Sequence, residues 1–107
     1  MKTVLFYLSF ILVCTNSFAQ NDIALQWQKN YGGSAGEIAR SVQQTTDGGY
    51  IFAGTTVSID SNIVGNHGLG DYWVVKTDPL GIVQWQKCYG GSSYEDAYCI
   101  KQTLDGG

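Results

Sequence analysis

Two pairs of carboxylates are the residues of this chain best suited to acid–base chemistry. Glu37 recurs 58 residues later as Glu95, and Asp47 recurs at the same distance as Asp105. A glycosidase needs two carboxylates about 5–9.5 Å apart, and each normally occurs once in its protein. A structural carboxylate instead recurs in every repeat. We therefore interpret both pairs as turn and repeat-edge residues, with Asp47 accepting hydrogen bonds from backbone amides, and assign no catalytic residue.

The segment 58–70, SIDSNIVGNHGLG, is the longest connection and the first place to look for a ligand. Counted from Asp60, oxygen-bearing side chains fall at the third, seventh and twelfth positions and glycine at the sixth, a partial calcium-loop pattern. These residues are Asn62, Asn66, Asp71 and Gly65. Val64 stands where a fifth-position oxygen is needed, so a solvated turn is the alternative that we favour, and no metal ligand or cofactor is assigned. His67 has no second His or Cys at metal-ligand spacing and is expected to be an ordinary loop residue.

The phrase QWQKNYGGS at 26–34 returns as QWQKCYGGS at 84–92. Sliding the chain by 58 residues aligns 26–49 with 84–107 without a gap, and 15 of the 24 pairs are identical. Such self-similarity indicates a repeat architecture. We expect one full repeat at 25–82 and part of a second at 83–107, within a fragment of a longer protein.

Four of the nine residues at which the second copy departs from the first bear on function. Cys88 and Cys99 stand where the first copy has Asn and Ser, and Tyr94 and Tyr98 replace Gly and Arg. In an oxidising compartment the two cysteines can form a disulfide that contributes about 3 kcal/mol, provided that their Cα atoms lie within about 7 Å. The alternative is two buried free thiols. The tyrosines are candidates for an aromatic contact with a ligand, or else pack between repeats.

Residues 1–19 have the features of a secretory signal peptide. Lys2 precedes an apolar run at 4–13, and Ser17-Phe18-Ala19 predicts cleavage after Ala19. The run is too short for a transmembrane helix, which needs about 20 residues. Lipidation of Cys14 is an alternative. We expect a secreted or cell-surface protein with a short N-terminal segment at 20–24.

The charge of the mature chain excludes one class of partner. Without Lys2 the chain has five basic and nine acidic side chains. A protein that binds nucleic acid needs a basic surface to contact the phosphates. We therefore predict that nucleic acid is not a partner, and we predict no membrane span after cleavage.

The repeat interior predicts four strands and an all-β fold. Strands are expected at 38–46, 50–57, 71–77 and 82–89, joined in part by the tight turns Asp47-Gly48-Gly49 and Asp78-Pro79-Leu80-Gly81. Consecutive strands of this kind form an antiparallel meander. Its aromatic faces need cover, which stacking of successive sheets into a β-propeller of four to eight blades would supply. A β-solenoid is the alternative.

The string DGGYIFAGTT…GLGDYWVVKTDPLGIVQWQKCYGGS resembles secreted repeat proteins of Bacteroidota. The resemblance covers 25–107, and Asp71-Tyr72-Trp73 and Trp85 are its most specific parts. It implies propeller-like blades and, in full-length members, a sorting domain for type IX secretion. The spacing Asp78-x-x-Gly81-x-x-x-Trp85 is also similar to quinoprotein-type blades, in which a tryptophan docks between neighbours. No catalytic residue comes with either resemblance.

We therefore expect a non-catalytic scaffold or binding module. Its partners would be an extracellular glycan or protein, together with the rest of its own propeller. The alternative is that the chain is the propeller part of an extracellular hydrolase, with an endoglucanase-like activity carried by a catalytic part outside this chain.

Overall fold

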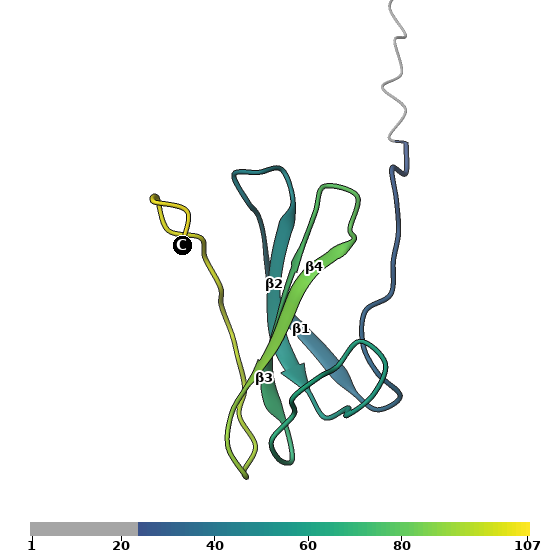
Figure 1. Ribbon diagram of the computed structural model, residues 1–107, viewed down its shortest axis with the longest axis vertical. Helices are drawn as coiled ribbons and strands as arrows, with labels where there is room; N and C mark the ends of the chain where they lie inside the picture. Colours follow the sequence, from purple (N-terminus) through teal and green to yellow (C-terminus); the bar gives the residue numbers. More distant parts are fainter. Residues whose placement is uncertain (1–23) are drawn as a thin grey trace, which may run out of the picture.

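The computed structural model describes residues 24–107, which contain four strands and no helix (Figure 1). The predictions for the signal peptide at 1–19, for lipidation of Cys14 and for nearly all of the segment 20–24 lie outside the described residues. The predicted all-β class is confirmed.

The strands form one antiparallel sheet in chain order. They are β1 Glu37–Gln44, β2 Tyr50–Thr56, β3 Asp71–Thr77 and β4 Val83–Tyr89, and each pairs with the next. The predicted meander is thus confirmed, with strand ends within two residues of those expected. β1 and β4 are the edge strands of this sheet.

Glycine turns set the ends of these strands. After β1, the amide of Thr45 donates to Gly49 O at 2.9 Å, and Gly48 adopts a φ of 83°, which favours glycine. Before β4, the amide of Gly81 donates to Asp78 O at 3.1 Å and closes the predicted proline turn. Gly81 also has a positive φ, of 77°.

One face of the sheet, the first face, carries the apolar core. Trp73, Val75 and Cys88 are buried there with Ile63 of the long loop, and Phe52 and Tyr31 pack against them. Tyr31 belongs to the segment 24–33, which crosses this face outside the sheet. The cover of the first face therefore comes from two segments that are not strands.

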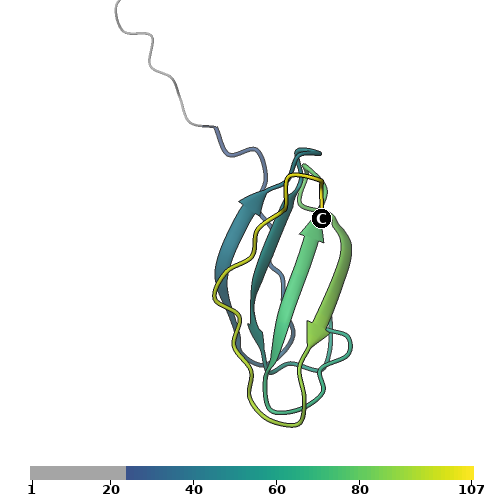
Figure 2. The ribbon, with the colours of Figure 1, turned by 90° about the vertical axis from the view of Figure 1, so that its left-hand side faces the viewer.

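Over β1 and β2, the opposite, second face is covered by the C-terminal segment 95–102. This segment runs beside β1, and the sheet separates it from the segment 24–33 (Figures 1 and 2). Ala53 and Thr55 of β2 are buried beneath it. Residues 53–56 are buried, as expected for a strand that is covered on both faces.

Over β3 and β4 the second face is open. Tyr72, Trp85 and Tyr89 lie on this side of the sheet and are 38–46% exposed. Three aromatic side chains on one strand pair form an apolar surface that soluble proteins usually cover.

Valine-to-alanine substitutions at two positions test where the core lies. Val75 is fully buried and Val64 is 69% exposed. Val75→Ala should lower the free energy of unfolding by about 1.5–3 kcal/mol, and Val64→Ala should change it by less than about 0.5 kcal/mol. Urea denaturation measures both, and equal costs would contradict this assignment of the core.

Candidate functional site

The two glutamates of the repeat occupy equivalent turns. Glu37 Oε2 accepts a hydrogen bond from the amide of Gly33 at 3.2 Å, and Glu95 Oε2 accepts one from the amide of Gly91 at 3.1 Å. The second oxygen of Glu37 accepts from the hydroxyl of Thr56 at 2.9 Å. These contacts agree with the interpretation of both glutamates as turn residues.

The two aspartates also have matching environments. Asp47 Oδ1 accepts from the amide of Gly49 at 2.9 Å and from the hydroxyl of Thr45 at 2.5 Å. Asp105 Oδ1 accepts from the amide of Gly107 at 3.4 Å and from the hydroxyl of Thr103. Each carboxylate caps its own glycine turn, as predicted for Asp47.

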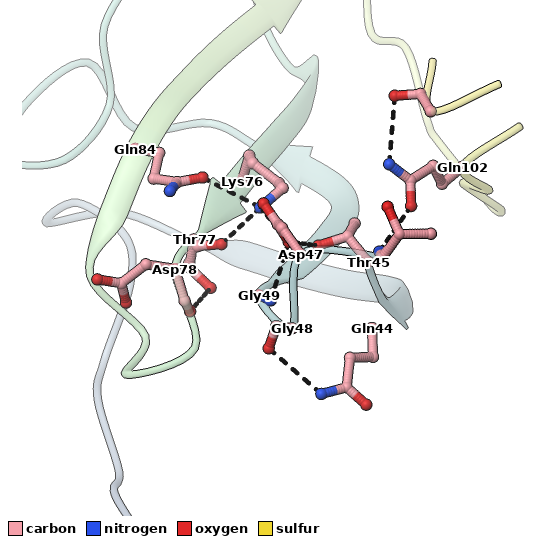
Figure 3. A network of polar contacts seen from close by, with 12 residues as sticks. Gln44, Thr45, Asp47, Gly48, Gly49, Lys76, Thr77, Asp78, Gln84 and Gln102 are labelled. Atoms are coloured by element: carbon pink, nitrogen blue, oxygen red, sulfur yellow. Dashed lines mark hydrogen bonds and ion pairs between the residues drawn. The ribbon is translucent and has the colours of Figure 1, made fainter.

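A lysine that sequence reasoning missed connects the first of these turns to the sheet (Figure 3). Lys76 of β3 is only 8% exposed, and its Nζ donates to Asp47 Oδ2 at 2.9 Å. It also donates to Thr77 O at 2.8 Å and to Gln84 Oε1 at 3.0 Å. A buried charge needs such partners. The sequence feature that could have indicated this burial is a lysine directly after the apolar run YWVV.

Electrostatics at this turn favour the ionised aspartate. The hydrogen bond from Thr45, followed by that from Lys76 and that from the Gly49 amide, holds the pKa of Asp47 far below its usual range. The Thr103 hydroxyl and the Gly107 amide also lower the pKa of Asp105. Asp47 is therefore already a structural anion and is poorly suited to donate a proton near neutral pH.

The oxygens of the long loop bind separate backbone groups. Asp60 Oδ1 accepts from the amide of Ser34 at 2.8 Å, and Asn62 Oδ1 accepts from that of Gly32 at 3.4 Å. Asn66 Oδ1 accepts from the amide of Gly68. Among residues 24–107, no three His, Cys, Asp or Glu side chains form a group that could hold a metal. This geometry favours the turn over the calcium alternative.

His67 is paired, although we expected an ordinary loop residue. Its Nδ1 lies 2.6 Å from Asp71 Oδ2, which also accepts from the His67 amide at 3.1 Å. Asp71 is completely buried, and its Oδ1 has no hydrogen-bond partner within the described part of the chain. In that same part no hydroxyl or thiol is hydrogen-bonded to the His67 ring, as a nucleophile–base pair would require. The pair joins the long loop to the first residue of β3.

Both cysteines are free thiols on opposite sides of the sheet. Cys88 points into the first-face core, whereas Cys99 lies in the segment on the second face and is exposed. Neither sequence-based alternative, a disulfide or two buried thiols, describes this arrangement, because Cys99 is exposed beside β1 whereas Cys88 is buried on β4, at the other edge of the sheet. Burial raises the pKa of the Cys88 thiol, and the nearby carboxylate of Asp71 adds to this effect.

The two tyrosines of the second copy contact the first. Arg40 stacks on the ring of Tyr98 with its Cζ 5.0 Å from the centroid, and its Nη2 lies 2.9 Å from Asp96 Oδ2. Tyr94 packs its ring against Gly70. Both tyrosines nevertheless remain more than half exposed. These contacts favour packing between repeats over ligand binding.

Among the hollows of residues 24–107, we consider two as ligand sites. A cavity of about 200 Å³ on the first face is lined by aromatic side chains and Glu37, and it is smaller than the roughly 300–1,000 Å³ of typical ligand pockets. A shallow groove of about 530 Å³ runs along the β4 edge. Its lining residues are Val64, Gly65, His67, Val83, Trp85, Gln86, Lys87 and Cys88.

Comparisons with protein-family models, curated proteins and solved structures gave no match for this chain. Within residues 24–107 we also find no helix that is long and apolar enough to cross a bilayer. The geometry of the described residues is therefore the basis for the proposal below.

The acid sensitivity of the chain should depend on Asp47. Because folding lowers its pKa, the stabilisation is complete above the unfolded value of about 4 and is lost as the pH falls towards the folded value. We expect Asp47→Asn to reduce the fall in unfolding free energy between about pH 6 and about pH 3. Asp105→Asn removes the matching carboxylate of the second copy, which has no lysine partner, and it should reduce this fall in free energy less. Urea denaturation across this range checks both, and equal slopes for Asp47→Asn and wild type would contradict the assignment.

Proposed function

We propose that this chain belongs to an exported repeat protein in which four-stranded sheets stack face to face as propeller blades. The observation that supports this most strongly is a set of contacts between residues about one repeat apart. Ser41 Oγ accepts from the amide of Ile100, and Gln43 Oε1 accepts from the amide of Gln102. The sequence separation is 59 residues in both cases, close to the 58-residue period. Successive copies therefore meet at matching positions.

The first face supports the same arrangement from the other side. The segment 26–31 matches most of β4 in sequence. It lies on the first face of the sheet that follows it in the chain. Trp27 Nε1 donates to Pro79 O at 3.0 Å, and Tyr31 OH donates to Gly81 O at 2.5 Å. Their rings pack against Tyr50 and Phe52. A β4-type segment on one face and a β1-type segment on the other is an arrangement that can continue from repeat to repeat.

The polar groups support a scaffold or binding role rather than catalysis. Backbone amides donate hydrogen bonds to the carboxylates of Glu37, Asp47 and Asp60. The carboxylate of Asp71 is buried against His67. Carboxylates held in this way are poorly placed to act as the acid and base of a glycosidase. The hydrolase alternative would thus need residues outside 24–107. In our proposal the loops at the sheet ends bind an extracellular glycan or protein.

The location is part of the same proposal. Export rests on the signal-peptide features of residues 1–19, and the Bacteroidota resemblance suggests the type IX route.

Matched tryptophan variants test stacking. An extended chain, consisting of residues 20–107 followed directly by a second copy of residues 50–93, keeps the repeat in phase because Gly107 matches Gly49. Trp27→Phe removes one hydrogen bond and should cost about 1 kcal/mol in both chains. Trp85→Phe should cost less than about 0.5 kcal/mol in the original chain and about as much as Trp27→Phe in the extended one. If Trp85→Phe has the same small effect in both chains, stacking is contradicted.

The proposed role is tested on the complete secreted protein. Incubation with carboxymethylcellulose should release no new reducing ends, and a glycan array or a pull-down of extracellular proteins should identify a saturable partner. Release of reducing ends in proportion to the protein added would instead support the hydrolase alternative.

A further inference from the structure

The turn 32–35, which leads into β1, is held by the long loop of the same repeat. The amide of Ser34 donates to Asp60 Oδ1 at 2.8 Å, and the amide of Ala35 donates to Ser58 Oγ at 2.9 Å. The approach is close, since a methyl group added at Gly33 would lie 2.6 Å from Asp60 Oδ1. A Ser-x-Asp segment thus supplies the acceptors for two consecutive amides of this turn.

The copy of this turn, at 90–93, lacks those partners. Its glutamate contact is retained through Glu95, but within the described residues no acceptor is bonded to the amides of Ser92 and Ser93. All four residues of the turn are exposed. The acceptors that serve the first turn come from a loop that follows it in its own repeat, and the matching loop would lie beyond Gly107.

The opposite side of the second turn is occupied by the loop of the preceding repeat. A methyl group at Gly68 would lie 2.5 Å from Gly91 O and 2.9 Å from Ser92 Cα. The amide of Glu95 donates to Gly70 O at 2.7 Å, and Gly70 pairs with Tyr94 as a parallel bridge. The turn 32–35 therefore shows the contact with the long loop that follows it in the chain. The turn 90–93 shows the contact with the long loop that precedes it.

Combining the two halves, we propose that each Gly-Gly-Ser turn is a joint clamped between the long loops of two successive repeats. The amides of Ser92 and Ser93 form the open half of this joint, and they bind the aspartate carboxylate and the serine hydroxyl of a Ser-x-Asp segment in the following repeat. This inference rests on the proposed stacking, and it adds the chemistry of the partner. A carboxylate is a strong acceptor for backbone amides, so the contact is selective for an acidic loop.

Amide hydrogen exchange in the extended chain tests the joint directly. We expect exchange at Ser92 and Ser93 to be at least about tenfold slower than in residues 20–107 alone, since a charged acceptor contributes roughly one tenfold step or more. Replacing the aspartate of the added loop, the copy of Asp60, by asparagine should restore fast exchange at Ser92. The matched control is Asp60→Asn in the first loop, which should accelerate Ser34 and leave Ser92 unchanged.

The outcomes separate this inference from the proposed stacking. Slow exchange in the added strands and loss of Trp85 solvent exposure, together with fast exchange at Ser92 and Ser93, would overturn the joint and keep the stacking. An added repeat that folds but leaves Trp85 exposed would overturn both.

A peptide titration gives a second readout that does not depend on folding of the added repeat. A synthetic peptide of residues 56–63, TVSIDSNI, is added to residues 20–107 and followed by amide chemical shifts. We expect saturable shifts at Ser92 and Ser93 that are lost with the Asp60→Asn peptide. No shift at either amide, or equal shifts with both peptides, would count against the joint.

Discussion

The constraint on which this structure depends is that a single four-stranded sheet has two faces, and both need cover. The first face buries Trp73 and Val75 beneath the segment 24–33 and Ile63, and the second buries Thr55 beneath 95–102. Neither covering segment is a strand of this sheet, and each matches part of a strand or turn of the other copy. This arrangement is the basis of our proposal that the sheet lies between neighbours of its own kind. The exposed aromatic side chains on β3 and β4 show where the cover of the second face is incomplete.

The acidic side chains follow from the same design. Glycine-rich turns lie before β1 and between β1 and β2, and such turns leave backbone amides that require acceptors. The carboxylates of Glu37, Asp47 and Asp60 provide these acceptors, and Lys76 forms an ion pair with Asp47. Side chains of a type suited to acid–base chemistry thus hold turns. This use is the reason that we propose a scaffold or binding role rather than catalysis.

Two β-bulges explain much of what pattern reading could not anticipate. The register shifts between Ala39 and Ser41 of β1, and again where Lys76 and Thr77 of β3 face β4. A shift of one residue reverses which side chains face which side of the sheet. The extra residue in β1 is Arg40, which reaches Asp96 and Tyr98 of the second copy. In β4 it is Gln84, which accepts from Lys76.

The sequence by itself determined the four strands, their antiparallel order and the two glycine turns, because each depends on residues close together in the chain. The 58-residue copy likewise identified Glu37 and Asp47 as recurring turn residues before any contact was known. Only the tertiary structure decided which side chains meet across long separations. It placed Cys88 and Cys99 on opposite faces, paired His67 with Asp71 and buried Lys76 against Asp47. These outcomes depend on strand register, on the bulges and on loops folding over the sheet, which local periodicity does not encode.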